Sequence, residues 1–385
     1  MKRISILGST GSIGRTTLSV VERFPERFRV VGLAAGSNLD CLAEQVVRFR
    51  PSVVSVSGAS EARELRRRVG ACGTEIVFGS EGLLRVAREP ADLLVSALVG
   101  ALGLVPTFAA IEAGADVALA NKEVLVVGGE LVTKAAEKAG VRLLPTDSEH
   151  NAIFQALQGS RREDVRRIVL TASGGPFRGK KTAELEGVTP EEALRHPTWK
   201  MGAKITVDSA TLMNKGFEVI EAHWLFEIPP DRIEVWVHPQ SIVHSLVEFR
   251  DGSSIAQLGI PDMAIPISYV LGYPERLEMD HLPRLDLPSA GPLTFEPPDL
   301  ETFPCLALAY EAVRVGGTAP AVLNAANEVL VDAFLSARIR FLDIPRLLRL
   351  VLERHEPAPA RTLEAILEAD RWARAEAKRL VDGRL

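Results

Sequence analysis

Short apolar runs alternate with amphipathic stretches through the first 146 residues, and this alternation restricts the possible fold more than any other feature. Runs of strand length occur at 3–7, 30–34, 53–56, 93–96, 116–120 and 142–144, and helical periodicity separates them, as at 13–22 and 39–48. Strands that alternate with helices form βαβ units, whose buried parallel strands are continuously apolar. We therefore predict an α/β fold with an N-terminal doubly wound, Rossmann-like parallel sheet over residues 1–147.

The pattern changes beyond residue 160. Apolar runs at 167–171, 233–237, 243–249 and 254–258 predict strands, and Asp251-Gly252 between the last two is typical of a hairpin turn. These runs indicate a central α+β domain over 148–282 with a more antiparallel sheet. A proline-rich linker is predicted at 283–303. Helical periodicity at 306–315, 319–335, 344–354 and 362–381 predicts a C-terminal helical bundle over 304–385.

Composition narrows the class of protein. The 385 residues are 46% hydrophobic and 25% charged with a net charge of −5, which fits a soluble globular protein and supplies no basic surplus for a nucleic-acid partner. Three scattered cysteines without metal-ligand spacing suggest reduced thiols in the cytoplasm. The uncharged stretch 93–111 approaches the length of a membrane span, but Gly100, Gly103 and Pro106 interrupt it, so we predict no membrane segment.

A glycine-rich turn follows the first predicted strand. The run from Gly8 to Gly14 reads GSTGSIG, which spaces its glycines as GxxGxxG rather than GxGxxG. Such a turn lets a pyrophosphate approach the start of a helix, although an ordinary tight turn is the alternative. After the second strand, Ser37 and Asn38 stand where an NAD site usually has a carboxylate. This favours NADP, while Asp40 nearby and the lack of an Arg or Lys leave the preference open.

Acidic residues follow the sixth predicted strand, at Asp147 and Glu149. In an extended backbone, residues i and i+2 point the same way, so these two carboxylates could converge at the carboxyl end of the sheet. Adjacent carboxylates share a proton or hold a cation, and all-oxygen ligands favour Mg²⁺ or Mn²⁺; a solvated turn is the alternative. The stretch 208–218 contains hydroxyl, amide and ammonium groups that could donate hydrogen bonds to a bound anion. Its last residue, Glu218, could provide a third carboxylate for the cation. His150, His223, His238 and His244 lack ligand spacing, so we predict structural roles for them.

Six blocks of sequence carry a family resemblance. The sequence resembles the 1-deoxy-D-xylulose 5-phosphate reductoisomerases over almost its whole length, through GSTGSIG at 8–14, ANKE at 120–123, DSEHN at 147–151, TASGGPF at 171–177, HPTWKMG at 196–202 and the stretch 208–218. The proline-rich linker and the terminal helices also fit that family's three-part layout. Several of these blocks are long and unusual, which makes chance agreement implausible.

The resemblance implies an activity and its partners. Members of this family convert 1-deoxy-D-xylulose 5-phosphate into 2-C-methyl-D-erythritol 4-phosphate in non-mevalonate isoprenoid precursor biosynthesis. The conversion is a rearrangement, through retro-aldol cleavage and re-addition, followed by reduction. The implied cofactors are NADPH and a divalent cation, which is Mg²⁺, Mn²⁺ or Co²⁺. The implied partner is a small phosphosugar, and the implied assembly is a homodimer.

The resemblance also assigns site residues. It implies that NADPH contacts Thr10, Gly11, Ser12, Ile13, Gly36, Ser37, Asn38, Asn121, Glu123 and Gly202. It implies that the metal ligands are Asp147, Glu149 and Glu218. The implied substrate contacts are Lys122, Ser148, Glu149, Ser173, His196, Ser209, Asn214, Lys215 and Glu218, with catalytic roles for Lys122, Glu149 and His196. A lid around 196–204 would carry Trp199 and Met201. Some relatives have a basic residue where Ser37 stands, so the strength of the NADP preference stays open.

Two other classes of function fit parts of the sequence. An NADP-dependent, metal-assisted dehydrogenase without isomerase activity would share the glycine-rich turn, but it would need neither a phosphate cradle nor three carboxylates. A non-catalytic dinucleotide sensor would need an output module, and the C-terminal helices show no basic stripe.

Overall fold

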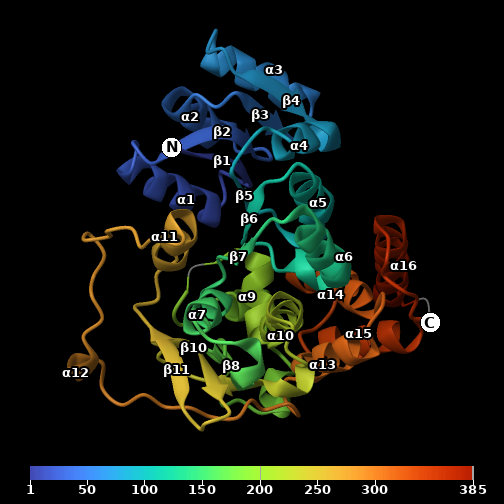
Figure 1. The fold of residues 1–385 in the computed structure, drawn as a ribbon. Helices are drawn as coiled ribbons and strands as arrows, with labels where there is room; N and C mark the ends of the chain where they lie inside the picture. Colours follow the sequence, from blue (N-terminus) through green and yellow to red (C-terminus); the bar gives the residue numbers. More distant parts are fainter. Residues whose placement is uncertain (200, 384–385) are drawn as a thin grey trace. The chain divides into compact units, whose positions relative to one another are not determined.

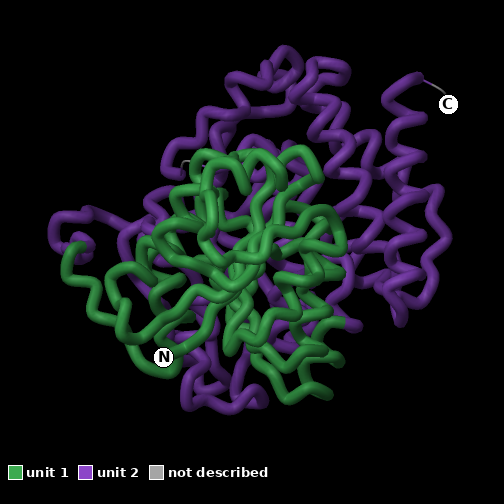
Figure 2. The backbone as a smooth tube through the Cα atoms, turned by 90° about the horizontal axis from the view of Figure 1, so that it is seen from above, with its two compact units in different colours: residues 1–124, 132–148, 263–281 green, residues 125–131, 149–262, 282–385 purple. Residues whose placement is uncertain are grey.

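The computed structural model describes residues 1–199 and 201–383, which form two compact units (Figure 2). Unit 1 comprises residues 1–124, 132–148 and 263–281, and unit 2 comprises residues 125–131, 149–262 and 282–385. The chain therefore passes between the units several times.

Unit 1 is built on a seven-stranded sheet with the strand order β4-β3-β2-β1-β5-β6-β7, in which every neighbouring pair is parallel. Its strands are β1 (Lys2–Leu7), β2 (Phe28–Ala34), β3 (Val53–Val56), β4 (Glu75–Phe78), β5 (Leu93–Ser96), β6 (Asp116–Leu119) and β7 (Leu143–Pro145). The predicted α/β fold with a doubly wound sheet is confirmed. Strand β4 was not predicted, because this short edge strand has only three consecutive apolar residues and is exposed at both ends.

Helices connect the consecutive strands of this sheet (Figure 1). They are α1 (Ser12–Arg23), α2 (Leu39–Phe49), α3 (Ala59–Val69), α4 (Gly79–Ala87), α5 (Leu104–Glu112) and α6 (Glu123–Ala139), with a 3-10 turn η1 (Gly100–Gly103) before α5. The connections through α1, α2 and α3 progress from β1 towards β4, whereas those through α4, α5 and α6 progress in the opposite direction, from β4 to β5 and on to β7. Because such crossovers are right-handed, α1 to α3 cover one face of the sheet and α4 to α6 cover the other. The strand order reverses between β1 and β5, and ligands of open α/β sheets bind at such a switch point.

Unit 2 contains a four-stranded mixed sheet with the order β11-β10-β8-β9. Strand β10 (Val243–Phe249) pairs antiparallel with β8 (Val165–Ala172) and with β11 (Ser254–Leu258), whereas β9 (Ile233–Val237) runs parallel to β8. The prediction of a more antiparallel second sheet is therefore right for two of its three pairings. Three helices bring the candidate site residues of this unit together: α7 (Ser148–Ala156), α9 (Ala203–Ala210) and α10 (Met213–Phe226).

Helices of the C-terminal part share one hydrophobic core with the central part of unit 2. They are α13 (Cys305–Val315), α14 (Ala319–Leu335), α15 (Asp343–Glu353) and α16 (Leu363–Val381), close to the predicted helices. Phe217 and Ile220 of α10 belong to the same core as Leu306 and Leu330. The helical bundle at 304–385 is therefore not a separate compact unit, because its apolar faces pack against the central residues.

The unit boundaries also differ from the predicted domains at 263–281. These residues were assigned to the central domain, but α11 (Ala264–Gly272) packs on α1 in unit 1. The Nζ atom of Lys2 donates to the carbonyl of Leu271 at 2.7 Å, and Arg27 pairs with Glu275 at 2.6 Å. The functional limits of the three predicted domains stay a prediction.

The remaining segments are short. The stretch 173–204 includes a 3-10 turn η3 (Thr182–Leu185) and the one-turn α8 (Pro190–Ala193), while η2 (Arg162–Asp164) and η4 (Pro230–Arg232) precede β8 and β9. The predicted linker at 283–303 contains the one-turn α12 (Leu287–Ala290). Among residues 1–199 and 201–383, no helix combines the length and the apolar character needed to cross a membrane.

His244 in β10 makes the stability of the protein depend on pH. Burial lowers the pKa of His244 from its ordinary 6.5 to about 4. Between these values the unfolded chain binds one more proton than the native chain, so stability is complete above pH 6.5 and falls as the pH drops toward 4. We expect a loss of about 3 kcal/mol over this range, at about 1.4 kcal/mol per pH unit. Urea unfolding at several pH values measures it.

The slope of stability against pH should flatten in His244→Gln, whatever the absolute stability of that variant. His281 is exposed and provides the matched control, so His281→Gln should keep the wild-type slope. An unchanged slope in His244→Gln would show that another group causes the acid sensitivity.

Candidate active site

The glycine-rich turn between β1 and α1 is packed so tightly that it admits no side chain at two positions. A Cβ atom on Gly14 would lie 2.4 Å from the carbonyl oxygen of Gly8, and a Cβ atom on Gly8, whose φ is +85°, would lie 2.3 Å from the carbonyl oxygen of Ala97. Gly11 caps α1 in an extended conformation, and the first turn of the helix holds no acidic residue. The exposed residues Gly11 and Ser12 therefore present the positive end of a helix dipole to solvent, as an anion site requires.

The turn after β2 holds the residues predicted to select NADP. Gly36, Ser37 and Asn38 are exposed, and the side chain of Asn38 accepts a hydrogen bond from the amide of Cys41 at 3.3 Å, which caps α2. The structure adds a cation that the sequence analysis missed, because Arg68 of α3 forms an ion pair with Asp40 in the first turn of α2. Only the tertiary fold brings this arginine to the turn.

The ANKE block lies between β6 and α6. The amide of Asn121 donates to the carbonyl of Gly100 at 3.0 Å, which ties the block to η1. Lys122 is 6% exposed, and its ammonium lies 2.6 Å from a carboxylate oxygen of Asp147. Glu123 begins α6, where a carboxylate is favoured by the helix dipole. The structure thus brings together Lys122 and Asp147, which lie 25 positions apart in the sequence.

The backbone at the acidic block differs from the prediction. We expected Asp147 and Glu149 to share a face of an extended segment, but α7 begins at Ser148, so that argument is wrong. The run of polar residues from 147 to 149 favours a helix start over continuation of the strand. Glu149 consequently lies in the first turn of α7 and points its carboxylate toward α10 rather than along the strand.

Lys215 is the centre of a buried charge cluster in unit 2. Its ammonium donates to the carboxylate of Glu149 at 2.9 Å, to the carbonyl of Thr171 at 2.5 Å, and to the carboxylate of Glu218. Lys215 is 3% exposed and Glu218 is 1% exposed. Burial alone would lower the pKa of Lys215, but the two carboxylates outweigh it and raise that pKa, so the lysine is charged. Glu149 and Glu218 thus converge on one point, the ammonium of Lys215, and their role as metal ligands stays a prediction.

Helix α10 provides two of these groups and a supporting amide. The side-chain amide of Asn214 donates to Glu218 at 2.7 Å, and the spacing of four residues makes the two side chains neighbours on one helix face. Ser209 lies on the preceding helix α9. Asp208 anchors α9, since it pairs with Lys204 at 3.0 Å and accepts from Asn327 of α14 at 2.7 Å.

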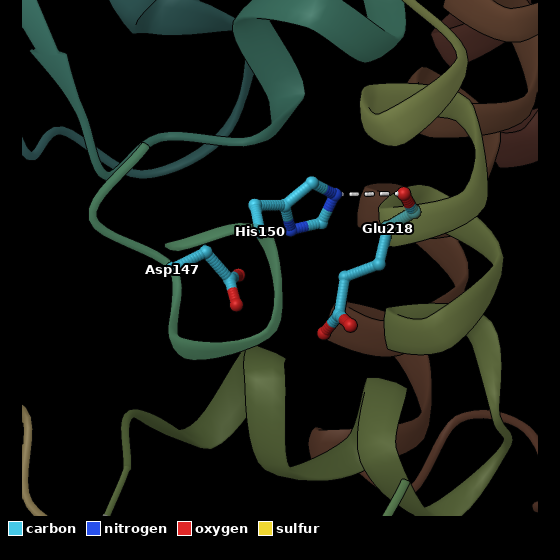
Figure 3. Close-up of side chains that lie close together, drawn as sticks. All are labelled: Asp147, His150 and Glu218. Carbon is cyan, nitrogen blue, oxygen red and sulfur yellow. Dashed lines mark hydrogen bonds between the residues drawn. The ribbon is translucent and has the colours of Figure 1, made fainter. Parts of the chain in front are cut away.

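His150 belongs to the group of possible metal ligands as well. Ligand atoms of Asp147, His150 and Glu218 lie within 4.8 Å of one another (Figure 3). Asp147 directly precedes the first residue of α7. The Nε2 atom of His150 lies 2.9 Å from the carbonyl oxygen of Glu218 and 3.5 Å from Glu221. Because a carbonyl only accepts, Nε2 carries a proton and donates, which links α7 to α10. This link fits the predicted structural role of His150.

Ser173 and His196 meet although 23 residues separate them. The Nε2 atom of His196 lies 3.0 Å from the hydroxyl of Ser173, while its Nδ1 atom accepts from the amides of Thr198 and Trp199 at 3.2 and 2.9 Å. Nδ1 is therefore the unprotonated nitrogen, and Nε2 carries the proton. Burial lowers the pKa of His196, which favours this neutral form. The ring offers a fixed N–H donor beside a hydroxyl group.

Gly175 closes the same corner of unit 2. A Cβ atom at this position would lie 2.7 Å from the carbonyl oxygen of Ser209, and its φ of +69° also favours glycine. The chain after β8 thus approaches the backbone of α9, which brings Ser173 and Ser209 into one neighbourhood. Ser173 and Ser209, two of the predicted phosphate contacts, therefore lie near the end of β8.

The predicted lid is described in part. Trp199 and Met201 are half-buried, Gly202 caps α9 in an extended conformation, and Lys200 lies outside the described residues. The lid function of this segment stays a prediction.

The donor set suits a hard divalent cation. Glu149 and Glu218 already surround one positive charge, the ammonium of Lys215, and Asp147 pairs with another in Lys122. Carboxylate oxygens are the ligands that Mg²⁺ and Mn²⁺ prefer. Buried acids that gather around a cation can exchange an ammonium for a metal ion, so the residues present fit the predicted metal.

Three features define the class of protein: the doubly wound sheet, its anion-binding turn and the buried carboxylate cluster. The class is that of dinucleotide-dependent oxidoreductases with a divalent-metal centre. Residues 4–129 match the family model of 1-deoxy-D-xylulose 5-phosphate reductoisomerase, residues 143–226 match that of its C-terminal domain, and residues 258–376 match a further C-terminal domain of DXP reductoisomerase. The chain belongs to the 1-deoxy-D-xylulose 5-phosphate reductoisomerase family, which confirms the resemblance seen in the sequence.

Individual relatives match over the full length. The reductoisomerase of Symbiobacterium thermophilum is 59% identical, with 98% of each chain covered, and that of Chlorobium phaeobacteroides is 56% identical, covering 99% of this chain and 100% of the relative. The reductoisomerase of Zymomonas mobilis in complex with NADPH has a TM-score of 0.93 at 44% identity, covering 99% of both chains. A DOX-P reductoisomerase in complex with NADPH, fosmidomycin and magnesium has a TM-score of 0.93 at 40% identity, covering 99% of this chain and 98% of that one.

Proposed function

We propose that this protein converts 1-deoxy-D-xylulose 5-phosphate into 2-C-methyl-D-erythritol 4-phosphate with NADPH and a divalent cation, in non-mevalonate isoprenoid precursor biosynthesis. The observation that carries the proposal is the convergence of Glu149, Glu218 and Lys215 in one buried cluster. A dehydrogenase without isomerase activity has no need for such a cluster beside phosphate-type donors. The solved relatives that hold NADPH, magnesium and fosmidomycin support the same assignment.

The turn between β1 and α1 would bind the pyrophosphate of NADPH. Backbone amides at the start of α1, from Gly11 to Ile13, are aligned with the helix dipole and favour a negative group. NADPH supplies the hydride for the reduction step. The remaining proposed contacts are Thr10, Gly36, Ser37, Asn38, Asn121, Glu123 and Gly202.

The phosphate of the substrate would bind at the end of β8. Ser173 and the Nε2–H group of His196 offer donors 3.0 Å apart, and Ser209 adds a hydroxyl group from α9. Asn214 and Lys215 would complete the phosphate contacts from α10. A phosphate bound far from the reacting carbons supplies binding energy that orients them, which raises the rate of the chemical steps.

Asp147, Glu149 and Glu218 would hold the divalent cation. When bound, this cation supplies Lewis-acid chemistry by polarising the oxygens of the substrate. Lys122, held by Asp147 at 2.6 Å, would donate a hydrogen bond to a reacting oxygen, and Ser148 would contact the same part of the sugar. The segment 196–204, with Trp199 and Met201, would close over the substrate and exclude water.

We further propose a homodimer in the cytoplasm. The exposed edge strand β11, with Ile255 46% exposed, offers unpaired backbone groups to a second copy. Cys41, Cys72 and Cys305 are free thiols, as expected in a reducing compartment. Sedimentation equilibrium would test the dimer.

Incubating the purified protein with 1-deoxy-D-xylulose 5-phosphate, NADPH and Mn²⁺ tests the function. We expect oxidation of NADPH, monitored by absorbance, together with a branched carbon skeleton in the product by NMR. Removing the cation with a chelator should stop both, and adding Mn²⁺ back should restore them. An unrearranged product would favour a simple dehydrogenase, and NADPH binding without turnover would favour a sensor.

A further inference from the structure

Lys215 satisfies all its donors within the carboxylate cluster. An ammonium group has three hydrogens to donate, and the three acceptors are Glu149, Glu218 and the carbonyl of Thr171. Because the residue is only 3% exposed, this lysine does not face the solvent, and a ligand does not meet it on arrival. Its positive charge balances two carboxylates that would otherwise repel each other.

The same two carboxylates are the proposed ligands of the divalent cation. A metal ion bound by Glu149 and Glu218 would lie next to the ammonium of Lys215, and two like charges at such a separation repel strongly in a buried site. The lysine and the metal therefore compete for the same oxygens.

We propose that Lys215 is an internal counter-cation, which the divalent cation displaces from Glu149 and Glu218, and that the displaced ammonium then binds the substrate phosphate. The inference rests on the proposed function and goes beyond it, because it makes metal binding and phosphate binding a coupled pair. Coupling of this kind is reciprocal: phosphate that captures Lys215 must also tighten the metal.

Neighbouring residues support the exchange. Thr171, which accepts from Lys215, lies two residues before Ser173, so the ammonium already lies beside the segment proposed to bind phosphate, and the flexible lysine stem lets the ammonium rotate. Asn214 holds Glu218 at 2.7 Å through a separate hydrogen bond, so Glu218 keeps a partner when the lysine leaves. Glu218 therefore stays positioned on α10 without the lysine.

Binding of Mn²⁺ to the full-length, metal-stripped protein tests the competition, with free Mn²⁺ measured by EPR at about pH 8, where carboxylates are ionised. We expect Lys215→Gln to bind Mn²⁺ about tenfold more tightly than the wild type, within the usual range of coupling between sites. Lys181→Gln is the matched control, since Lys181 is exposed and pairs with Asp299 elsewhere in unit 2, and its Mn²⁺ affinity should not change. Equal or weaker affinity in Lys215→Gln would overturn the proposal.

Inorganic phosphate tests the coupling. It should tighten Mn²⁺ binding about fivefold or more in the wild type and have no effect in Lys215→Gln. The same phosphate effect in both proteins would refute a linkage through Lys215.

If Lys215→Gln does not fold, amine acetylation of the wild-type protein followed by mass spectrometry gives the answer. Mn²⁺ should increase the labelling of Lys215 severalfold and leave the labelling of Lys181 unchanged, whereas equal or lower labelling of Lys215 would overturn the displacement.

The experiments distinguish a failure of this inference from a failure of the proposed function. Mn²⁺ binding that is lost in Glu218→Gln but unaltered in Lys215→Gln would keep the metal site and reject the counter-cation, whereas no Mn²⁺ binding by the wild type would reject the proposed metal dependence.

Discussion

Glu218→Gln should lose at least about 100-fold in kcat while NADPH binds as tightly as before. The substitution keeps the shape of a side chain that is 1% exposed but removes the charge that a divalent cation requires. A metal ion contributes several kcal/mol to the stabilisation of developing charge, and about 1.4 kcal/mol corresponds to a factor of ten in rate. The glycine-rich turn lies in unit 1 and Glu218 in unit 2, so the cofactor site is built from other residues.

Steady-state kinetics at saturating Mn²⁺ and NADPH fluorescence titration measure the two expected effects. Glu227→Gln is the control, because Glu227 follows the same helix α10 but is exposed and pairs with Arg162. That variant should keep wild-type turnover. Near-normal turnover of Glu218→Gln would contradict its assignment as a metal ligand.

Gly14→Ala should have the opposite effect, losing NADPH binding while Mn²⁺ binding is kept. In an ordinary helix this substitution stabilises by about 1 kcal/mol. Here the new methyl group would lie 2.4 Å from the carbonyl oxygen of Gly8 and 2.5 Å from the Cα atom of Ser9, and backbone atoms cannot rotate away. The turn must shift, and the loss of two charge-assisted hydrogen bonds at about 1.5–3 kcal/mol each weakens NADPH by about 100-fold or more.

Isothermal titration with NADPH and EPR with Mn²⁺ test this variant, and urea unfolding should show a loss of about 1–3 kcal/mol from overpacking. Gly187→Ala is the matched control, because a Cβ atom there meets no heavy atom of the described residues within 4 Å. Wild-type NADPH affinity in Gly14→Ala would show that the turn does not hold the cofactor. Together, the two variants separate the cofactor site from the metal site within one protein.

Most strands could be predicted from the sequence because their burial shows in their composition. Val53–Val56 and Leu93–Ser96 are fully buried parallel strands, and their continuous apolar runs gave their exact limits. Strand β4 has one buried residue among four, so no comparable pattern marks it. The start of α7 was missed for a different reason: three polar residues fit either a turn or a helix start, and the contacts of Glu149 with α10 involve residues 66 positions away.

For the proposed site, too, some features could be predicted from the sequence and others could not. Local sequence predicted the residues of the proposed site, since Asp147, Glu149, Ser173 and Lys215 all lie in blocks with recognisable spacing. It gave no sign that Lys215 pairs with the carboxylates rather than standing apart for a phosphate, nor that Arg68 reaches Asp40. Both are contacts between elements that are distant in the chain.

The amino-acid sequence by itself determined the class of fold, the alternation of most strands and helices and the glycine-rich turn, and it nominated the side chains of the proposed site, because each depends on neighbours along the chain. Only the tertiary structure decided which charges meet, that 263–281 packs with unit 1, and that the terminal helices share the core of unit 2. The physical reason is that apolar burial is non-directional, so a pattern shows that a face is buried but not what covers it.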